Sequence, residues 1–327
     1  IMVCLDDSPV ELSGGYPEGG TYTGAGVGGG FFDPSVAGVG SHTITYTVGV
    51  AGTNCFGQCE FEITVKPLPV LDCPAYMVAC EDDPPVLLNN SYPLGGDYTG
   101  TGVFFDGANY EFHPSVGPGT YIINYCFTDP ATGCENCCEF NFIVYAKPDV
   151  TCPEDFTICY DTAPFTLSGG LPTGGSYSGT GVSGGIFNPS LAGVGTHEIT
   201  YTYVDPQTLC ENYCTFTITV ILVEASCPDD FEICIDESAF ALSGGSPAGG
   251  TYSGIGVSGG MFYPGTAGVG PHIIVYTYVE PGTNCFGSCE FKITVNPLPQ
   301  MDCPPFMEAC EDDPPVLLNN SYPLGGD

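Results

Sequence analysis

The chain has 327 residues and is strongly acidic, with 38 Asp and Glu residues against three Lys and Arg residues and a formal net charge of −35. A surface of this charge repels phosphate groups, so the composition excludes nucleic acid as a partner. No run of about 18 apolar residues is present, which predicts that no part of this segment inserts into a membrane.

The 19 cysteines are the second compositional signal. Most of them come in sets of four per unit of about 75 residues, two near the start of the unit and two near its end. Domains this small usually need covalent support, and disulfides persist only in an oxidising compartment. We therefore expect a secreted, extracellular chain with no deliberately free thiol.

Internal repetition sets the domain organisation. The run Glu81 to Asp97 recurs letter for letter at Glu311 to Asp327, an offset of 230 residues (from position 81 to position 311). Shorter units are marked by the dipeptides Cys73-Pro74, Cys152-Pro153, Cys227-Pro228 and Cys303-Pro304. The predicted domains are 1–66, truncated at its start; 67–146, with an extra cysteine pair; 147–221; 222–296, a copy of the first; and 297–327, the start of a copy of the second.

The third unit serves as the example for the elements in chain order. Short strands are expected at 155–159 and 165–168, followed by extended pieces at 174–181 and 184–187 between Gly-Gly pairs. The clearest strand is 196–204, where alternation places His197, Ile199, Tyr201 and Tyr203 on one face. The last strand, 214–220, directs Cys214 to the same face as Phe216, Ile218 and Val220.

These patterns predict an all-β fold. No apolar period of 3.6 residues extends over ten residues, and the 47 glycines and 30 prolines would break a helix. Six or seven short strands with frequent turns predict an antiparallel, immunoglobulin-like β-sandwich in each repeat, stapled by disulfides. The linkers at 66–69 and 296–299 are proline-stiffened, which predicts semi-rigid spacing of successive units.

The repeated cysteines allow two interpretations. A tetrahedral zinc site usually has two to four residues between the cysteines of each pair, whereas six residues separate Cys73 from Cys80, and the second unit adds Cys126 and Cys137. The spacing therefore favours disulfides. Four cysteines allow three connectivities, and the residues alone do not choose among them.

Several motifs carry a resemblance to known repeats. The third unit contains LSGGLPTGGSYSGTGV, then FNP, then AGVGTHEITYTYV. This series resembles the repeats of large surface adhesins that gliding bacteria export through type IX secretion. The opening CPEDFTIC and closing CTFTITV are also similar to hyalin (HYR) repeats. The resemblance covers essentially the whole chain and implies giant cell-surface fibres, such as SprB-type gliding adhesins or the grappling-hook filaments of predatory relatives.

The resemblance also implies a disulfide pairing within each repeat. It favours Cys159 with Cys210 and Cys152 with Cys214 in the third unit. By repetition it implies the pairs Cys80 with Cys134, Cys73 with Cys138, Cys234 with Cys285, Cys227 with Cys289, Cys4 with Cys55, and Cys126 with Cys137 as the extra bridge of the second unit. Such bridges would force tension to break a covalent bond before most of a unit unravels.

Acidic clusters near the start of each unit raise the alternative of a cation site. The strongest is Glu81, Asp82 and Asp83. Calcium takes six to eight oxygen ligands, which two neighbouring units could supply together. No D-x-D-x-D loop is present, so the sequence favours a solvated acidic rim, with calcium as the cofactor alternative.

No residue pattern predicts catalysis. His42, His197 and His272 occupy one repeated position, and Tyr121 replaces them in the second unit, which indicates a structural role. An enzyme would need unique polar residues that break the repeat, and none assemble.

The favoured function is a non-catalytic structural segment of an extracellular bacterial fibre that serves adhesion, gliding or prey capture. We expect a homo-oligomeric filament or bundle. The alternative is an adhesin module that binds cell-surface glycans through the second unit. Its altered loop holds the candidate ligand-binding residues Phe104, Phe105, Tyr110, Phe112 and His113.

Overall fold

The computed structural model describes residues 1–301, 308, 310–312, 314 and 315. It divides into two compact units: Ile1–Asp149 with Val204–Asn212, and Val150–Tyr203 with the chain from Tyr213 onward. Most of the predicted repeat 297–327 lies outside the described residues. Among the described residues, no helix has the length and apolar character that a membrane crossing needs.

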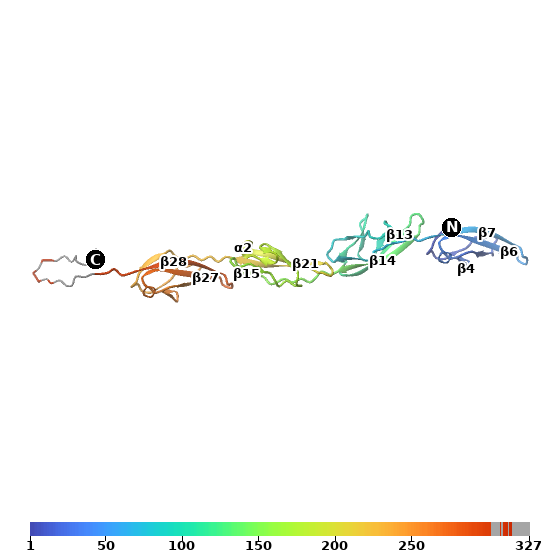
Figure 1. Cartoon of the computed structure of the whole chain (residues 1–327). Helices are drawn as coiled ribbons and strands as arrows, with labels where there is room; N and C mark the ends of the chain where they lie inside the picture. Colours follow the sequence, from blue (N-terminus) through green and yellow to red (C-terminus); the bar gives the residue numbers. More distant parts are fainter. Residues whose placement is uncertain (302–307, 309, 313, 316–327) are drawn as a thin grey trace. The chain divides into compact units, whose positions relative to one another are not determined.

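The strands come in four successive sets of seven, drawn along the chain in Figure 1. The first strands are β1 (Met2–Cys4), β8 (Tyr76–Cys80), β15 (Phe156–Cys159) and β22 (Phe231–Cys234). The second are β2 (Val10–Glu11), β9 (Val86–Leu87), β16 (Phe165–Thr166) and β23 (Phe240–Ala241). The third are β3 (Thr21–Thr23), β10 (Asp97–Thr99), β17 (Ser176–Gly179) and β24 (Thr251–Gly254).

The fourth strands are β4 (Val27–Gly28), β11 (Val103–Phe105), β18 (Val182–Ser183) and β25 (Val257–Ser258). The fifth are β5 (Phe31–Phe32), β12 (Tyr110–Phe112), β19 (Ile186–Phe187) and β26 (Met261–Phe262). The sixth are β6 (Gly40–Gly49), β13 (Gly119–Thr128), β20 (Gly195–Val204) and β27 (Gly270–Val279). The seventh are β7 (Phe56–Lys66), β14 (Glu135–Tyr145), β21 (Glu211–Ile221) and β28 (Phe286–Asn296).

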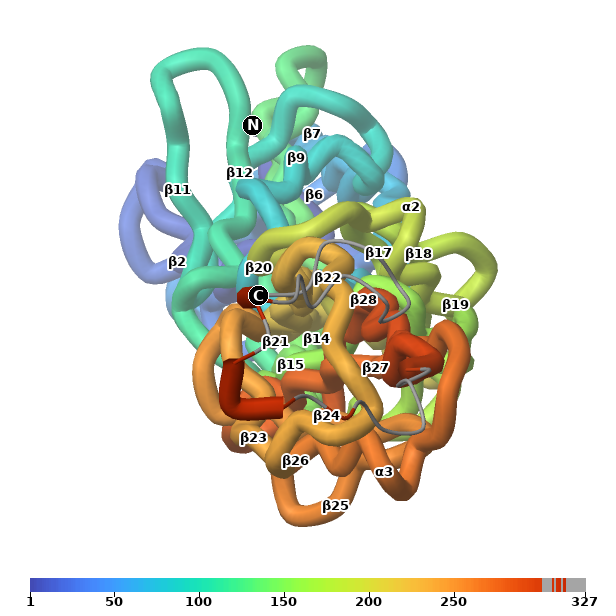
Figure 2. Tube along the Cα trace, turned by 90° about the vertical axis from the view of Figure 1, so that its left-hand side faces the viewer, coloured from blue at the N-terminus to red at the C-terminus, as the bar shows by residue number. Residues whose placement is uncertain are grey.

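Each set forms two sheets with the strand order of an immunoglobulin-like sandwich. In the third repeat a four-stranded sheet has the order β15-β21-β20-β17, and a three-stranded sheet has the order β16-β19-β18. The other three repeats have the same two sheets. In the fourth repeat, β24, β27 and β28 lie on one side and β23, β25 and β26 on the other (Figure 2). The predicted all-β, immunoglobulin-like fold is therefore confirmed.

The first strand departs from the antiparallel rule, because it pairs in parallel with the seventh. In the second repeat the register joins Asn141 to Tyr76 and Tyr145 to Cys80. The same pairing occurs in the other three repeats. A strand parallel to its neighbour finishes at the same end of the sheet as that neighbour. This puts the end of the first strand next to the start of the linker.

The core follows the predicted alternation. In the third repeat, Ile199 on β20 and Ile218 and Val220 on β21 are fully buried, and Phe187 closes the core from the other sheet. Intervening residues such as Thr200 and Thr219 lie on the outer face. Equivalent clusters fill the other three repeats.

The Gly-Gly motifs are explained by a buried tyrosine on the sixth strand. Tyr201 donates a hydrogen bond to the Pro172 carbonyl and accepts one from the Gly175 backbone N–H at 2.8 Å. A Cβ on Gly170 or Gly175 would overlap the ring of Tyr201. The loop between the second and third strands therefore wraps closely around this ring, which requires glycine at both contacts.

A one-turn helix follows the fifth strand in every repeat, an element that the sequence did not predict. These helices are α1 (Pro34–Ala37), the 3-10 helix η1 (Pro114–Val116), α2 (Pro189–Ala192) and α3 (Pro264–Ala267). Proline occupies the first turn, and in α2 the Asn188 side chain accepts from the Ser190 N–H at 3.1 Å. A helix of one turn is too short to have an apolar period, so it escapes sequence detection.

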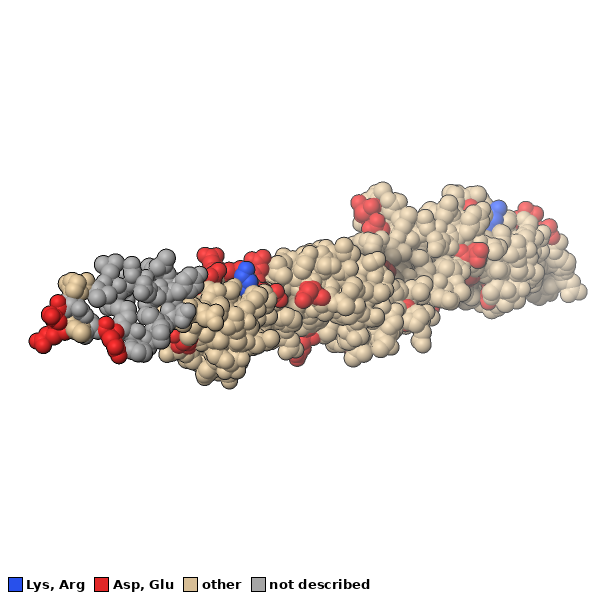
Figure 3. All heavy atoms as spheres, turned by 60° about the vertical axis from the view of Figure 1, so that its left-hand side comes forward, with Lys and Arg blue, Asp and Glu red and all other residues tan. Residues whose placement is uncertain are grey.

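The surface carries acidic side chains in small groups, separated by broad areas of other residues (Figure 3). Lys147 pairs with Asp82 at 2.9 Å, and Lys292 pairs with Asp230 at 3.3 Å. Exposed ion pairs of this kind contribute roughly 0–1 kcal/mol each, so they do not determine the fold.

Candidate functional site: the joints between successive repeats

Seven disulfides are present among the described residues, and they differ from the predicted set in an informative way. Four predicted pairs occur in the structure: Cys73–Cys138, Cys152–Cys214, Cys227–Cys289 and Cys126–Cys137. Three further bonds connect successive repeats: Cys4–Cys134, Cys80–Cys210 and Cys159–Cys285. They replace four expected pairings within repeats, namely Cys4 with Cys55, Cys80 with Cys134, Cys159 with Cys210 and Cys234 with Cys285.

The parallel first strand is the physical reason for this correction. Cys80 lies opposite Tyr145 at the end of β14, whereas Cys134 immediately precedes Glu135 at the beginning of that strand. Ten residues of extended strand separate the two ends by about 34 Å. Disulfides need Cα atoms within about 7 Å, so the pairing within a repeat is excluded.

The same register applies to the other first strands. Cys4 lies opposite Lys66, Cys159 opposite Ile221, and Cys234 opposite Asn296. Each of these cysteines is therefore at the linker end of its sandwich, far from the hairpin loop between the sixth and seventh strands of its own repeat. In the structure Cys4 and Cys159 form disulfides with the corresponding loop of the following repeat, as Cys80 does.

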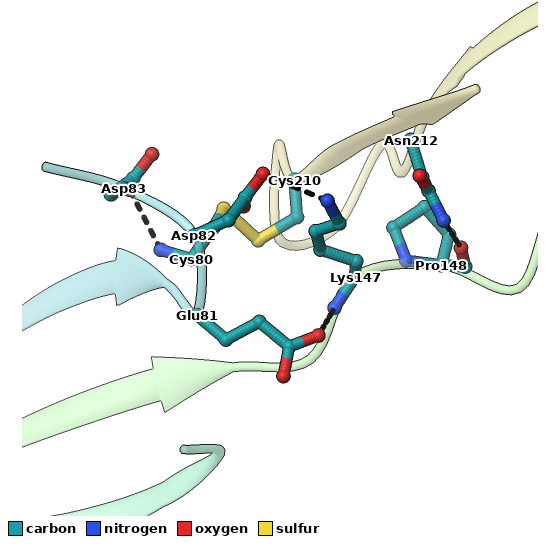
Figure 4. A network of polar contacts seen from close by, with 8 residues as sticks. All are labelled: Cys80, Glu81, Asp82, Asp83, Lys147, Pro148, Cys210 and Asn212. Carbon is teal, nitrogen blue, oxygen red and sulfur yellow. Dashed lines mark hydrogen bonds and ion pairs between the residues drawn. A yellow bond between two sulfur atoms is a disulfide. The ribbon is translucent and has the colours of Figure 1, made fainter. Parts of the chain in front are cut away.

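The joint at Cys80 illustrates the geometry (Figure 4). The Cα atoms of Cys80 and Cys210 are 5.6 Å apart. Beside the disulfide, the Asn212 side chain donates to the Pro148 carbonyl at 2.9 Å, which fixes the linker against the loop of the third repeat. Cys210 is fully buried in this contact. The loop Val204–Asn212 accordingly belongs to the same compact unit as residues 1–149.

The first joint repeats this arrangement. Cys4 and Cys134 have Cα atoms 5.6 Å apart, and Asn136 donates to the Pro69 carbonyl at 2.9 Å. Cys134 is fully buried. No sequence pattern predicted a role for Asn136 or Asn212. Their shared position two residues after the loop cysteine is the signal that could have identified them.

The third joint uses a glycine in place of the asparagine. The Cα atoms of Cys159 and Cys285 are 5.2 Å apart, and Gly287 occupies the position two residues after the loop cysteine. A Cβ at Gly287 would overlap the carbonyl group of Val223 in the linker. The backbone itself thus makes the close contact that the asparagine side chain makes in the other joints.

The acidic clusters have a structural role at these joints. The Asp83 carboxylate accepts from the Cys80 N–H at 2.7 Å, and Asp7 accepts from the Cys4 N–H at the same distance. Glu81 accepts from the Lys147 N–H at 3.0 Å. Each carboxylate therefore stabilises the turn or linker that positions a joint cysteine.

The calcium alternative at Glu81, Asp82 and Asp83 stays a prediction that the geometry does not favour. The three side chains point towards different partners: the Lys147 backbone, the Lys147 ammonium and the Cys80 N–H. Among the described residues, the group with all its ligand atoms within 4.8 Å of one another is Cys126, Glu135 and Cys137. Its two sulfurs are already joined in a disulfide and are not thiolate ligands.

The repeated histidines serve the fold. His42, His197 and His272 hydrogen-bond through Nε2 to the glycine carbonyl that ends the short helix, at 2.7, 2.9 and 2.8 Å. In the second repeat the Tyr121 hydroxyl donates to the equivalent Gly117 carbonyl at 2.9 Å. Both side chains reach the same partner, which explains why tyrosine replaces histidine there.

The aromatic residues of the second repeat divide into three locations. Phe112 is fully buried and stacks on Phe142 with ring centroids 3.8 Å apart, so it belongs to the core and is unavailable to a ligand, contrary to prediction. Phe104 lies against His113 with centroids 4.4 Å apart. Phe105 lies against Tyr110 with centroids 4.7 Å apart.

Phe105 and Tyr110 border a hollow of about 400 Å³ that is also lined by Leu88, Asp97 and Asn109. The Tyr110 hydroxyl donates to the Asp97 carboxylate at 2.6 Å, and this hydrogen bond raises the pKa of Tyr110. Asp106 accepts from the backbone N–H groups of Ala108 and Asn109, both at 2.7 Å, which shapes the turn between β11 and β12.

Comparison with known proteins gives a distant relative and no family. No family model matches the chain. It is 24% identical to Hyalin of Strongylocentrotus purpuratus over 282 residues, which cover 80% of this chain and 22% of Hyalin. The chain thus spans about a fifth of the length of that relative.

Solved structures give low similarity scores. The EC1-4 segment of Drosophila N-cadherin is 11% identical, with 91% of this chain and 98% of that chain covered and a TM-score of 0.25. The I67-I69 fragment of titin is 12% identical, with 79% and 94% covered and a TM-score of 0.26. The immunoglobulin-like assignment therefore rests on the strand order of the sheets.

Proposed function

We propose that this chain is a non-catalytic, load-bearing segment of an extracellular fibre. The observation that carries the proposal is the double covalent connection of each joint: a peptide linker and, beside it, a disulfide between repeats. Disulfides persist outside the reducing cytosol, which supports an extracellular location.

The disulfides create two covalent tracks along the chain. One track runs through the Cys4–Cys134 bond, along β14 and β15, and through Cys159–Cys285 into β28. The other runs along β7 and β8 and through Cys80–Cys210 into β21 and β22. The three long-range bonds within repeats cross-link the tracks: Cys73–Cys138, Cys152–Cys214 and Cys227–Cys289.

Tension applied to the chain ends would therefore be carried by the two covalent tracks and not by the other strands of each sandwich. The segments on the tracks are the first and last strands and the linkers, and a β-strand is already near full extension at about 3.4 Å per residue. The remaining residues of each repeat, such as the segment between Cys80 and Cys134, form loops that are closed by disulfides and carry no tension. The chain has little length to release while its disulfides are intact.

Force spectroscopy tests this function. With handles at residues 1 and 300, the shortest covalent path in the oxidised chain holds about 46 residues and extends to roughly 160 Å, against roughly 1,050 Å after reduction. We expect no unfolding steps beyond the shorter limit until reductant is added. Stepwise lengthening of the oxidised chain to several hundred Å would overturn the load-bearing function.

The resemblance supports a more specific setting, which we also propose. The fibre is a homo-oligomeric filament on a bacterial cell surface, exported by type IX secretion, and serves gliding adhesion or prey capture. Immunogold labelling with antibodies against residues 1–296 should decorate the shafts of surface fibres at regular intervals. Label confined to the cell interior, or to soluble monomers in the medium, would contradict this setting.

Glycan binding by the second repeat is the second candidate function. The hollow beside the exposed Phe105 and the half-buried Tyr110 supports it, because an aromatic ring with neighbouring polar groups suits a sugar ring. Binding on a glycan array should be lost when Phe105 and Tyr110 are both changed to Ala and kept when the exposed Phe286 is changed to Ala. Equal binding by all three proteins, or none by the unmodified chain, would reject this candidate.

A further inference from the structure

Two cysteines at opposite ends of the chain occupy joint positions without a joint. Cys234 ends β22 as Cys4, Cys80 and Cys159 end their first strands. Cys55 precedes β7 as Cys134, Cys210 and Cys285 precede their seventh strands. Among the described residues, both Cys234 and Cys55 are free thiols.

Burial distinguishes these two positions from the completed joints. The loop cysteines Cys134, Cys210 and Cys285 are at most 2% exposed, whereas Cys55 is exposed. Cys234 is likewise exposed, whereas Cys4, Cys80 and Cys159 are half-buried. The backbone differs too: a Cβ on Gly287 would overlap the Val223 carbonyl, but a Cβ on the equivalent Gly57 would meet no atom within 4 Å.

The sequence around Cys234 matches the first joint. Asn296 is followed by Pro297-Leu298-Pro299, as Lys66 is followed by Pro67-Leu68-Pro69. The carbonyl of Pro69 accepts the hydrogen bond of Asn136 in the first joint, so Pro299 offers the equivalent acceptor. The run 311–327 then repeats 81–97 of the second repeat.

We propose that Cys55 and Cys234 are two half-joints, each of which takes a further immunoglobulin-like repeat of the same polypeptide. Cys234 forms a disulfide with the loop cysteine of a further copy of the second repeat (67–146). In that copy, the asparagine equivalent to Asn136 donates a hydrogen bond to the Pro299 carbonyl. Cys55 forms a disulfide with the cysteine equivalent to Cys159, at the end of the first strand of a preceding copy of the third repeat (147–221). The linker that follows this copy packs on Gly57. Cys59, the equivalent of Cys289, forms the accompanying bond to the cysteine equivalent to Cys227. Each disulfide forms from two thiols by transfer of two electrons and two protons to a thiol-oxidising partner, such as a disulfide exchange protein or a small disulfide.

The chain itself supplies the sequences for a test. Appending residues 98–146 after Asp327 continues the copy of the second repeat. Placing residues 147–230 before Ile1 adds a repeat of the third kind, because Ile1 to Cys4 correspond to Phe231 to Cys234. The extended protein is purified without reductant, alkylated and digested, and its disulfides are mapped by mass spectrometry.

We expect Cys234 linked to the appended copy of Cys134, and Cys55 linked to the preceding copy of Cys159. The matched control changes the appended copy of Cys134 to Ser, after which Cys234 should become alkylated while the other bonds remain. Alkylated Cys234 and Cys55 in the unaltered extended protein would overturn the proposal, as would an added repeat that stays unfolded. A covalent dimer of the 327-residue chain through these two thiols would assign the half-joints to a second copy and overturn the commitment to one polypeptide.

This inference rests on the load-bearing function but can fail separately from it. The same digest reports on the Cys80–Cys210 bond, which carries the proposed function. If Cys80–Cys210 is present and Cys234 is alkylated, only the half-joint inference fails. If Cys80 is linked to Cys134, both fail.

Discussion

At the scale of single residues, the tyrosine on the sixth strand organises the loop that gives this sequence its Gly-Gly motifs. The Tyr201 hydroxyl satisfies both a carbonyl and an N–H group of that loop, and its ring is fully buried against Gly170 and Gly175. Removal of the hydroxyl would leave two backbone groups without their partner, and unsatisfied buried groups are costly.

Tyr201→Phe should therefore lower the free energy of unfolding by about 1–3 kcal/mol. Thermal unfolding under oxidising conditions measures this effect. The matched control is Tyr203→Phe on the same strand, where the side chain is half-buried and we expect a smaller change. Equal melting temperatures for the two variants would show that the hydroxyl of Tyr201 does not hold the loop.

Asp230 gives a prediction of pH dependence. The Lys292 backbone N–H donates to its carboxylate at 2.8 Å, and this bond, assisted by the Lys292 ammonium, lowers the pKa of Asp230 below its ordinary value of 3.8. A carboxyl group with a lowered pKa in the folded state stabilises the fold above its unfolded pKa, and this contribution is lost as the pH falls through the folded pKa.

Asp230→Ala should consequently reduce the melting temperature at pH 7 and have a diminishing effect as the pH falls below about 4. Unfolding curves of both proteins across pH 2 to 7 check the sign. A difference that grows towards low pH would contradict the assignment.

Calcium provides a third residue-scale prediction. Glu81, Asp82 and Asp83 are each engaged by a backbone N–H or by Lys147, so calcium would have to displace existing partners. We expect the melting temperature to be the same with millimolar calcium and with chelator. A rise in calcium that disappears in the variant Asp82→Asn would restore the calcium site.

At the scale of elements, the joint depends on how closely the seventh strand approaches the preceding linker. Gly287 on β28 contacts the Val223 carbonyl, and an added methyl group would force the two backbones apart. Gly287→Ala should destabilise the fourth repeat by about 1–3 kcal/mol, because overpacking displaces the surrounding structure.

The control for this change is Gly265→Ala in α3 of the same repeat, where a Cβ would meet no atom within 4 Å. It should leave the melting temperature unchanged or raise it slightly. Similar losses in both variants would mean that the contact with the linker contributes nothing particular to stability.

Strand existence could be predicted from the sequence, but disulfide connectivity could not. Alternation in 196–204 and 214–220 identified the long strands, and β20 and β21 extend over these residues. The pairing of Cys80 depends instead on whether β8 runs parallel or antiparallel to β14, and a five-residue strand contains no signal for its direction. The pairing within repeats that the resemblance implied was therefore wrong for Cys80, which bonds to Cys210.

Phe112 was wrongly included among the candidate ligand residues for a related reason. Phe104, Phe105 and Phe112 are alike in sequence, and only the pairing of β11 with β12 decides which side chain faces the core. The register places Phe112 opposite Val103, and Phe112 is fully buried. Alternation separates Phe104, which lies opposite Glu111, from Phe112, but it places Phe105 on the same side of the hairpin as Phe112.

The whole chain is covalently continuous through its joints as well as through its linkers. Every linker between described repeats is bridged by one disulfide that joins the two sides: Cys4–Cys134, Cys80–Cys210 or Cys159–Cys285. A fibre built in this way remains connected after cleavage of any one of these linkers. Disulfides confined to single repeats would give no such protection.

Cleavage of one linker tests whether a disulfide holds the two sides of a joint together. A protease site is inserted after Asp149, and the cleaved protein is compared on denaturing gels with and without reductant. We expect a single full-length band without reductant and two fragments with it. The variant Cys80→Ser with Cys210→Ser should separate without reductant, whereas Cys152→Ser with Cys214→Ser should stay joined. Separation of the unmodified protein into two fragments without reductant would contradict the account.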